Sequence, residues 1–296
     1  MSVTREMVGK VLVVTLDRPD ARNAFDRDTI EALTELFESV SYLEPAPPAG
    51  VSQQAYRDGE YRPHLVLLRS EGPIFCAGGD LVDMKRLGAA DFQENLEAAT
   101  EMGGMFRAIR LCPAPVVTRV QGAAYGGGVG LACACDIVVA GAEAKFAFSE
   151  VRLGLVAGVI APLVIDRIGL AAARHYFLTG EVISAEEAFR IGLVNRLAGP
   201  EGLAAAVNQT VCSLLQGGSA ALGRIKSLIE GTLSLGYERS LDFTAQMIAE
   251  ARTSAEAQAA LAAFFAKEPA PWAKDVAWPP PEPGASSPGD RPKGGP

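Results

Sequence analysis

The chain has 296 residues, of which 49% are hydrophobic and 21% charged, so it holds enough apolar sequence for one large domain or two smaller ones. Its formal net charge of −8 argues against a nucleic-acid partner. No uncharged apolar run of about eighteen residues occurs, and the N-terminal residues mix charged with polar side chains, so we expect neither a membrane span nor a signal sequence.

The five cysteines stand mostly among small apolar residues, which is typical of free thiols in a reducing cytoplasm. Cys133 and Cys135 are separated by one residue and no histidine lies near them in the sequence, so we expect no metal site. The sequence therefore predicts a cytoplasmic protein without disulfides or zinc.

The N-terminal part of the chain predicts a strand, a helix and an insertion. Residues 11–16 form an apolar run typical of a strand, and residues 29–40 carry apolar side chains at the spacing of an amphipathic helix. Between 44 and 63 the composition changes to Pro, Ala, Gln and Tyr. That change indicates an irregular surface insertion without a role in the core.

Two later segments share one pattern, in which a buried strand is followed by glycines and then by a helix. The strand, turn and helix are residues 65–68, 72–80 and 81–87 in the first unit, and residues 116–120, 121–130 and 131–136 in the second. In the first unit, Asp80 is placed to cap the helix.

Such turns leave backbone N–H groups unpaired at a helix N-terminus, where the helix dipole also favours negative charge. One glycine turn alone is explained equally well by turn geometry. Two of them, each at the end of a strand, supply one N–H apiece to a single oxygen. The pair therefore predicts a backbone oxyanion hole for an acyl carbonyl that turns into an enolate or alkoxide.

The rest of the chain alternates strands with helices and then becomes wholly helical. Strands are predicted at 137–140 and 144–148, and helices at 163–168, 171–178 and 185–191, with breaks at Gly169 and Gly180. This alternation favours parallel βαβ units, so we predict an α/β core over residues 1–200. Residues 201–268 predict a helical region with helices at 203–215, 220–233, 241–251 and 255–265. Residues 269–296 are rich in Pro, Gly and Ser and are expected to be disordered.

Several short segments, in a fixed order, carry a resemblance to a known family. They are Arg18-Pro19 with Asn23-Ala24, Phe75 to Leu81, Gly122 to Gly130, Cys135 to Ile137, Phe148 to Leu155, Leu178 to Gly180, Ala185 to Ala188, Gly192 to Val194, and Phe264 to Lys267. The chain resembles the crotonase superfamily, the enoyl-CoA hydratases and isomerases, over about residues 3–272. The resemblance implies ββα units wound into a spiral core, followed by a helical trimerisation region. It also implies homotrimers or dimers of trimers, and a CoA thioester as substrate with no separate cofactor.

The resemblance further implies roles for individual residues. The N–H groups of Gly79 and Gly127 match the oxyanion donors. The positions that line the path of the CoA adenine and pantetheine match Arg22, Ala24, Ala77, Asp80 and Leu81. Phe264 and Lys267 match residues that reach the CoA of a neighbouring subunit, although a plain exposed lysine fits position 267 as well.

Hydratases of this family commonly use two glutamates, and only one of the two matching positions holds one here. Gly130 stands at the first position and Glu150 at the second. Proton transfer next to a thioester needs a base whose pKa is pulled towards neutrality, which partial burial of Glu150 would provide; a solvated surface glutamate is the alternative. One carboxylate suffices to isomerise a double bond, whereas hydration or dehydration needs a second role from Asp80, Tyr125 or a bound water.

The glycine turn and the segment around Glu150 look most like the bacterial methylglutaconyl-CoA hydratase-like branch. Some polyketide β-branching dehydratases, which act on acyl groups carried by acyl carrier protein, share related sequence motifs. We therefore expect hydration or dehydration of an acyl-CoA or acyl-carrier-protein thioester, with isomerisation as the next possibility. A non-catalytic scaffold that keeps the fold is the rival from another class.

Two other classes of enzyme fit the sequence poorly. Neither His64 nor His175 accompanies a turn that would carry a nucleophile, so a serine hydrolase is not expected. The glycine spacing at 126–130 does not match a dinucleotide-binding fingerprint.

Overall fold

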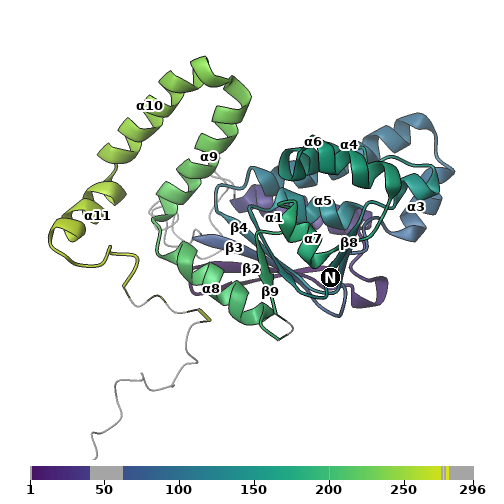
Figure 1. The fold of residues 1–296 in the computed structure, drawn as a ribbon, viewed down its shortest axis with the longest axis horizontal. Coiled ribbons are helices and arrows are strands. Elements are labelled where there is room, and N and C mark those ends of the chain that lie inside the picture. The colour runs from purple at the N-terminus through teal and green to yellow at the C-terminus, as the bar shows by residue number, and fades with distance from the viewer. Residues whose placement is uncertain (1, 41–62, 200, 275, 277, 280–296) are drawn as a thin grey trace, which may run out of the picture.

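The computed structural model of the protein describes residues 2–40, 63–199, 201–274, 276, 278 and 279 (Figure 1). Nearly all of the insertion expected at 44–63, and the end of the C-terminal segment, lie outside these residues. Over the described residues the chain forms two β-sheets surrounded by helices. None of the described helices is long and apolar enough to cross a lipid bilayer.

The larger sheet runs in the order β1 (Val3–Val8), β2 (Val11–Leu16), β3 (Leu65–Ser70), β4 (Val116–Val120), β6 (Ile137–Gly141) and β9 (Arg196–Ala198). β1 pairs with β2 in antiparallel fashion, and the other neighbours pair in parallel. The smaller sheet runs in the order β5 (Ala123–Tyr125), β7 (Lys145–Ala147) and β8 (Ile183–Ser184). The parallel pairs confirm the predicted α/β class.

The helices are α1 (Arg27–Val40), α3 (Leu81–Gly88), α4 (Phe92–Arg110), α5 (Gly127–Ala134), α6 (Ala161–Thr179), α7 (Ala185–Arg190), α8 (Leu203–Leu215), α9 (Ser219–Leu235), α10 (Tyr237–Thr253) and α11 (Ala255–Phe265). Short 3₁₀ turns cover Pro19–Ala21 and Glu150–Leu153. The predicted break at Gly169 is a kink inside α6, where this glycine has φ 75° and ψ 163°. Gly180 ends α6 in the left-handed conformation, as a C-terminal glycine commonly does.

Strand β2 shows how the larger sheet separates two apolar cores. It is buried along its whole length, and because side chains alternate across a strand, Leu12 and Val14 pack on one face and Val11 and Val13 on the other. Side chains of α1, α4, α5 and α6 fill the first core, and those of α8 fill the second. Burial on both faces explains why the strands read as continuous apolar runs.

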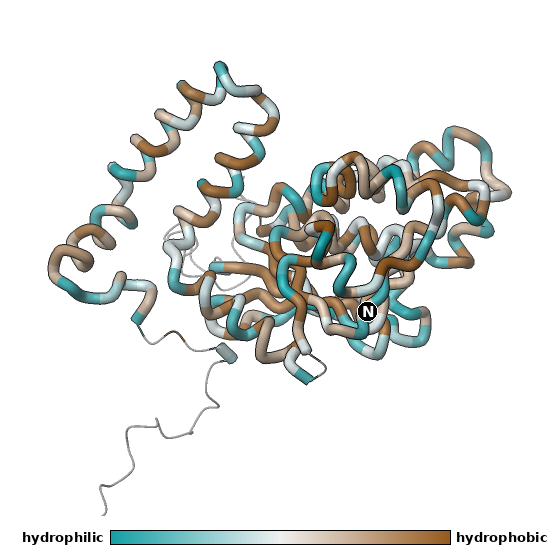
Figure 2. Tube along the Cα trace, in the orientation of Figure 1, coloured by the Kyte–Doolittle hydropathy of each residue, from teal (hydrophilic) through white to brown (hydrophobic). Residues whose placement is uncertain are grey.

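Helices α9, α10 and α11 form an arm that stands away from this body (Figure 1). Hydrophobic residues run along all three helices without a covering layer (Figure 2). Ile229 is 53% exposed, Leu233 62%, Phe264 73% and Phe265 79%. The arm therefore presents an apolar surface, although α9 joins the body through Lys226 with Asp136 at 2.6 Å and Arg110 with Glu230 at 2.9 Å.

The first part of the segment expected to be disordered instead packs on the body. The indole N–H of Trp272 donates to the carbonyl of Gln216 at 3.0 Å. Val276 and Trp278 pack against the core beneath α8. Composition alone underestimated this contact because Pro, Gly and Ser dominate residues 269–296 as a whole, although both tryptophans of the chain lie near its start.

Candidate active site

The two glycine turns lie side by side. Cys76 and Ala124 form an isolated parallel bridge, in which the N–H of Cys76 donates to Ala123 at 3.2 Å and the N–H of Tyr125 donates to Cys76 at 3.0 Å. Beyond this bridge Gly78 lies against Gly127, since a Cβ atom added to Gly127 would stand 3.7 Å from the Cα of Gly78. The two glycine turns, predicted from distant parts of the sequence, therefore lie next to each other, and the oxyanion roles of Gly79 and Gly127 stay a prediction.

Contacts at the neighbouring glycines show how closely the turns approach. A Cβ atom added to Gly78 would stand 3.2 Å from the Gly127 nitrogen. One added to Gly128 would stand 2.3 Å from the carbonyl oxygen of Cys76, so position 128 admits no side chain. Within the described part of the chain, neither the Gly79 nor the Gly127 N–H donates to a protein acceptor. Both remain available to a ligand, and Gly127 also opens α5, where the helix dipole favours negative charge.

A strand-like contact fixes the other side of Gly79. The N–H of Phe25 donates to Gly78 at 2.7 Å, and the N–H of Asp80 donates to Phe25 at 2.8 Å. Gly79 is thus held against Phe25, and its neighbour Gly78 packs against Gly127, which limits the freedom of Gly79 to rotate its N–H away.

Arg18 and Asn23 stabilise this arrangement, a role that the sequence reasoning missed. The Arg18 guanidinium donates to the carbonyl of Ala24 at 2.6 Å and pairs with the carboxylates of Asp26 and Asp80, each at 3.0 Å. The amide of Asn23 donates to the carbonyls of Glu71 and Ile74, at the start of the Gly79 turn. The signal was present as Arg18-Pro19 with Asn23-Ala24, but a side chain that binds backbone carbonyls far along the chain is not visible without the fold.

Glu150 lies beside the second turn. A Cβ atom added to Gly126 would stand 3.0 Å from Oε1 of Glu150, so the Glu150 carboxyl group lies next to the backbone one residue before Gly127. Its Oε2 is buried, and no atom of the described chain hydrogen-bonds to it. Burial raises the pKa of Glu150 above its usual value. A carboxylate that is partly desolvated and unpaired is suited to exchange a proton with a ligand.

The position of the first family glutamate is filled by other side chains. Gly130 is buried in α5, and a Cβ atom there would stand 2.2 Å from Cγ2 of Ile160 and 3.2 Å from Cζ of Phe106. Neither Ile160 nor Phe106 was singled out from the sequence, because both are distant from Gly130 along the chain. No second carboxylate fits at this position.

Two cavities lie next to these groups. One of about 270 Å³ is bordered by Gly79, Phe25 and Met84, and extends between α3 and α4. The other, about 260 Å³, lies beside Glu150 and is otherwise lined by apolar residues or glycine, among them Phe148, Phe177 and Val156. In the described residues no group of three His, Cys, Asp or Glu side chains is placed to hold a metal ion.

Comparison with known proteins assigns this geometry to a family. Residues 53–275 match the family described as enoyl-CoA hydratase/isomerase. The chain is 29% identical over 274 residues to the crotonyl-CoA hydratase of Syntrophomonas wolfei, covering 91% of this chain and 96% of that protein. It is 28% identical over 268 residues to the short-chain-enoyl-CoA hydratase of Clostridium acetobutylicum, covering 90% and 95%. A crystal structure of an enoyl-CoA hydratase from Shewanella pealeana superposes with a TM-score of 0.81 at 32% identity, covering 92% of this chain and 96% of that one.

The chain belongs to the enoyl-CoA hydratase/isomerase family. Its core has the crotonase fold, and the prediction of an enzyme of the enoyl-CoA hydratase type is confirmed.

The positions matched to the CoA path gather around the first turn. The N–H of Ala77 donates to the carbonyl of Arg22 at 3.0 Å, and Ala24 accepts from Arg18. Asp80 caps α3, since its Oδ1 accepts from the N–H of Val82 at 2.8 Å. This hydrogen bond, aided by Arg18, lowers the pKa of Asp80. Asp80 is therefore engaged as a cap and ion-pair partner, and Leu81 beside it is 79% exposed.

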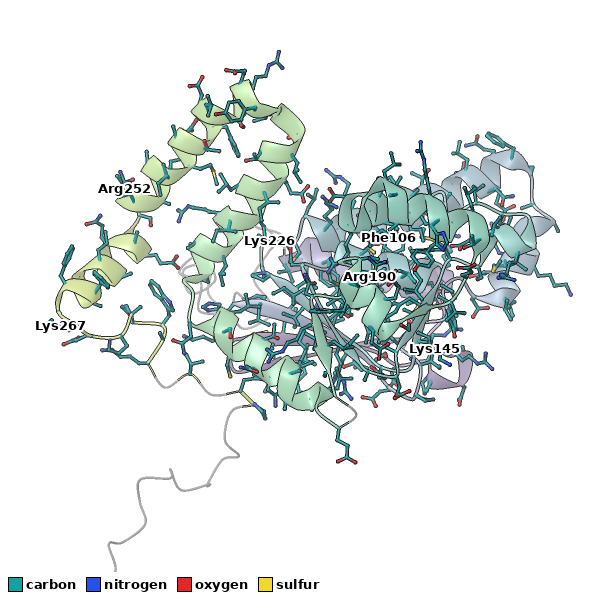
Figure 3. The ribbon with its side chains drawn as sticks, viewed as in Figure 1. Phe106, Lys145, Arg190, Lys226, Arg252 and Lys267 are labelled. Carbon is teal, nitrogen blue, oxygen red and sulfur yellow. The ribbon has the colours of Figure 1, made fainter. Side chains whose placement is uncertain are left out.

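Phe264 and Lys267 do not approach this site within the same chain. Both lie at the end of the arm, and Figure 3 shows Lys267 far from Phe106 of the core. Their predicted contact with a neighbouring subunit stays a prediction.

The two histidines lie apart from the turns. His64 contacts the carbonyl of Gly217 through Nε2 at 2.7 Å, and burial lowers its pKa. His175 is exposed and contacts Glu181 at 3.1 Å. Neither histidine lines either of the two cavities described above.

Proposed function

We propose that the protein hydrates 2-enoyl-CoA thioesters, or dehydrates the corresponding 3-hydroxyacyl-CoA. In this proposal, the N–H groups of Gly79 and Gly127 bind the thioester oxygen and Glu150 is the acid/base. The observation that supports it best is the unpaired, partly buried carboxylate of Glu150 beside the second glycine turn, together with the N–H groups of Gly79 and Gly127, which have no acceptor in the described part of the chain.

The two N–H groups favour the reaction because negative charge develops on the thioester oxygen. When a nucleophile adds at C3, the electron pair of the double bond moves towards the carbonyl and forms an enolate. Two preorganised donors stabilise that charge more than the neutral carbonyl of the substrate. Losing one such donor typically lowers the rate by about 10² to 10³.

Glu150 completes the reaction alone in this scheme. Its carboxylate takes a proton from water while the oxygen of that water bonds to C3, and the protonated carboxyl then returns the proton to C2 of the enolate. Dehydration is the same sequence in reverse. Burial raises the pKa of Glu150, which makes its carboxylate a stronger base towards water than an ordinary glutamate, and the protonated carboxyl can then return that proton to C2.

Isomerisation is the second candidate, and the filled position at Gly130 favours it. With no second carboxylate to orient water, Glu150 would move a proton between C4 and C2 of an enoyl thioester. A carrier-protein phosphopantetheine ends in the same arm as CoA, so a polyketide-type dehydratase uses the same residues.

We further propose that the arm pairs with other copies to form a homotrimer or a dimer of trimers. The exposure of Phe264, Phe265 and Leu233 supports an apolar contact there. In such an assembly Phe264 and Lys267 would reach the CoA of a neighbour. Light scattering of the purified protein tests the stoichiometry, and a monomer at micromolar concentration would contradict it.

The deciding experiment follows crotonyl-CoA in deuterated water by mass spectrometry. Hydration gives a product heavier by one water that carries deuterium at C2. Isomerisation is tested instead with 3-pentenoyl-CoA as substrate, which an isomerase converts to the 2-enoyl isomer without adding water. If a thioester binds but shows neither turnover nor exchange at its α-carbon, the protein is a scaffold and the proposal fails.

A further inference from the structure

The cavity next to Gly79 has an apolar interior. A Cβ atom added to Gly79 would stand 3.7 Å from the sulfur of Met84, so this wall begins at the proposed thioester site. Ile30, Met102 and Val159 continue it. An acyl group whose thioester oxygen is bound at Gly79 has this cavity beside it. Its volume of about 270 Å³ lies at the lower end of small-molecule sites, which favours a short acyl chain.

The charged side chains around the same cavity are mostly acidic. Its lining holds the carboxylates of Asp80, Asp83, Glu94, Glu97 and Glu101, against the guanidinium groups of Arg27 and Arg86. The excess negative charge faces any group that extends from the thioester between α3 and α4.

Both guanidinium groups of the lining are already paired with carboxylates of the same cavity. Arg27 pairs with Glu101 at 3.2 Å, and Arg86 pairs with Asp83 at 3.5 Å and with Glu94. Glu97 accepts a hydrogen bond from Gln93 at 2.9 Å, and no described cation pairs with it. A carboxylate on the acyl group would have to displace one of these acids and would lie near Glu97.

We infer that the protein selects short, uncharged acyl groups and rejects acyl groups with a distal carboxylate, and that Glu97 is a specificity-determining residue. The inference rests on the proposed function of the same site. It differs from the methylglutaconyl-type substrate suggested by the sequence, because that acyl group carries such a carboxylate. Rejection here follows from like charge, and from the pairing of both guanidinium groups that line the cavity in the described part of the chain.

Binding of saturated analogues tests this inference independently of turnover. Titration calorimetry compares butyryl-CoA with glutaryl-CoA, which differ by the distal carboxylate and share the CoA part. We expect the wild type to bind butyryl-CoA at least about tenfold more tightly at low salt, and the ratio to shrink at high salt because exposed charges are screened. Equal affinities, or a preference for glutaryl-CoA, overturn the inference whether or not crotonyl-CoA is hydrated.

Charge reversal at position 97 gives the second test of the inference. Glu97→Lys should improve the glutaryl-to-butyryl affinity ratio about three- to tenfold, and Glu97→Gln should give a smaller gain. Glu143→Lys changes net charge equally at an exposed turn that lines neither cavity, and should leave the ratio unchanged. If Glu97→Lys leaves the ratio as in wild type, Glu97 does not determine specificity. If the affinity ratios come out as expected but crotonyl-CoA is not hydrated, only the proposed reaction is overturned, and the inference about specificity stands.

Discussion

Ile160 occupies the space that a side chain at position 130 would need. A Cβ atom on Gly130 would stand 2.2 Å from Cγ2 and 2.9 Å from Cβ of Ile160. Because the contact includes the Cβ of Ile160, no rotation of that side chain relieves it. The single-carboxylate site is therefore fixed by packing between α5 and the start of α6, and a second glutamate cannot be restored by one substitution.

Gly130→Ala should destabilise the protein by about 1–3 kcal/mol, the usual cost of overpacking a tight core. Urea unfolding measures this, with Gly158→Ala as the control, since a Cβ atom there meets only Val156 at an ordinary 3.6 Å. In an Ile160→Gly background the same Gly130→Ala change should cost less, because the two nearest atoms are gone and only Cζ of Phe106, at 3.2 Å, remains close. Equal costs in both backgrounds would show that Ile160 does not exclude the side chain.

Replacing Glu150 by Gln should remove most of the turnover while acyl-CoA still binds, because the amide cannot accept and return a proton. Glu143→Gln, at an exposed turn, is the matched control. In the wild type, kcat/KM should rise with pH through a pKa above that of an ordinary glutamate, about 4.3, because burial disfavours the ionised form. An active Glu150→Gln enzyme would refute the assigned role.

The stability of this variant separates lost chemistry from lost folding. Since the pKa of Glu150 is raised in the folded state, its ionisation destabilises the fold as pH rises from the unfolded value through the folded one. Glu150→Gln has no charge to desolvate, so at pH 7 it should unfold at the same urea concentration as wild type or a higher one. A marked drop in that concentration would mean that the carboxylate stabilises the fold.

The features that the sequence predicted are those with local signals. Strands 65–68 and 116–120, the glycine turns after them and the cap at Asp80 each depend on a few adjacent residues, and the structure contains them. That the N–H groups of Gly79 and Gly127 share one oxygen was inferred from chemistry, since two donors at strand ends suit one oxygen, and it stays a prediction.

Other features depend on contacts that a single sequence does not display. The contact of Ile160 with Gly130 exists only once α6 packs on α5. β1 was not predicted because it is an edge strand whose middle residues are exposed. α4 was missed because two glycines and many polar residues blur its apolar stripe, although Met105, Phe106 and Ile109 are buried.

Gly127→Pro should lower kcat by about 10² to 10³, because proline removes one of the two N–H donors. Gly127→Ala keeps the N–H but places a Cβ atom 3.3 Å from the Phe25 ring, so it should retain more activity. Kinetics with crotonyl-CoA, and circular dichroism to confirm folding, compare the two. Proline is tolerated at the first position of a helix, which makes a folded variant reasonable. A folded Gly127→Pro protein with wild-type kinetics would rule out the Gly127 N–H as an oxyanion donor.

Asp80 links the first turn to Arg18, and its replacement tests that link through stability. Asp80→Ala removes the cap of α3 and the ion pair with Arg18, and should cost about 1–2 kcal/mol of unfolding free energy. Asp80→Asn keeps a capping oxygen and loses only the charge, so its loss should be smaller. Because the pKa of Asp80 is lowered in the folded state, its stabilisation is present above the unfolded aspartate value of about 3.9 and is lost as pH falls through the folded value. The difference between wild type and Asp80→Asn in urea unfolding should therefore shrink from pH 7 towards pH 3, and a difference that stays constant would show that the carboxylate charge contributes nothing.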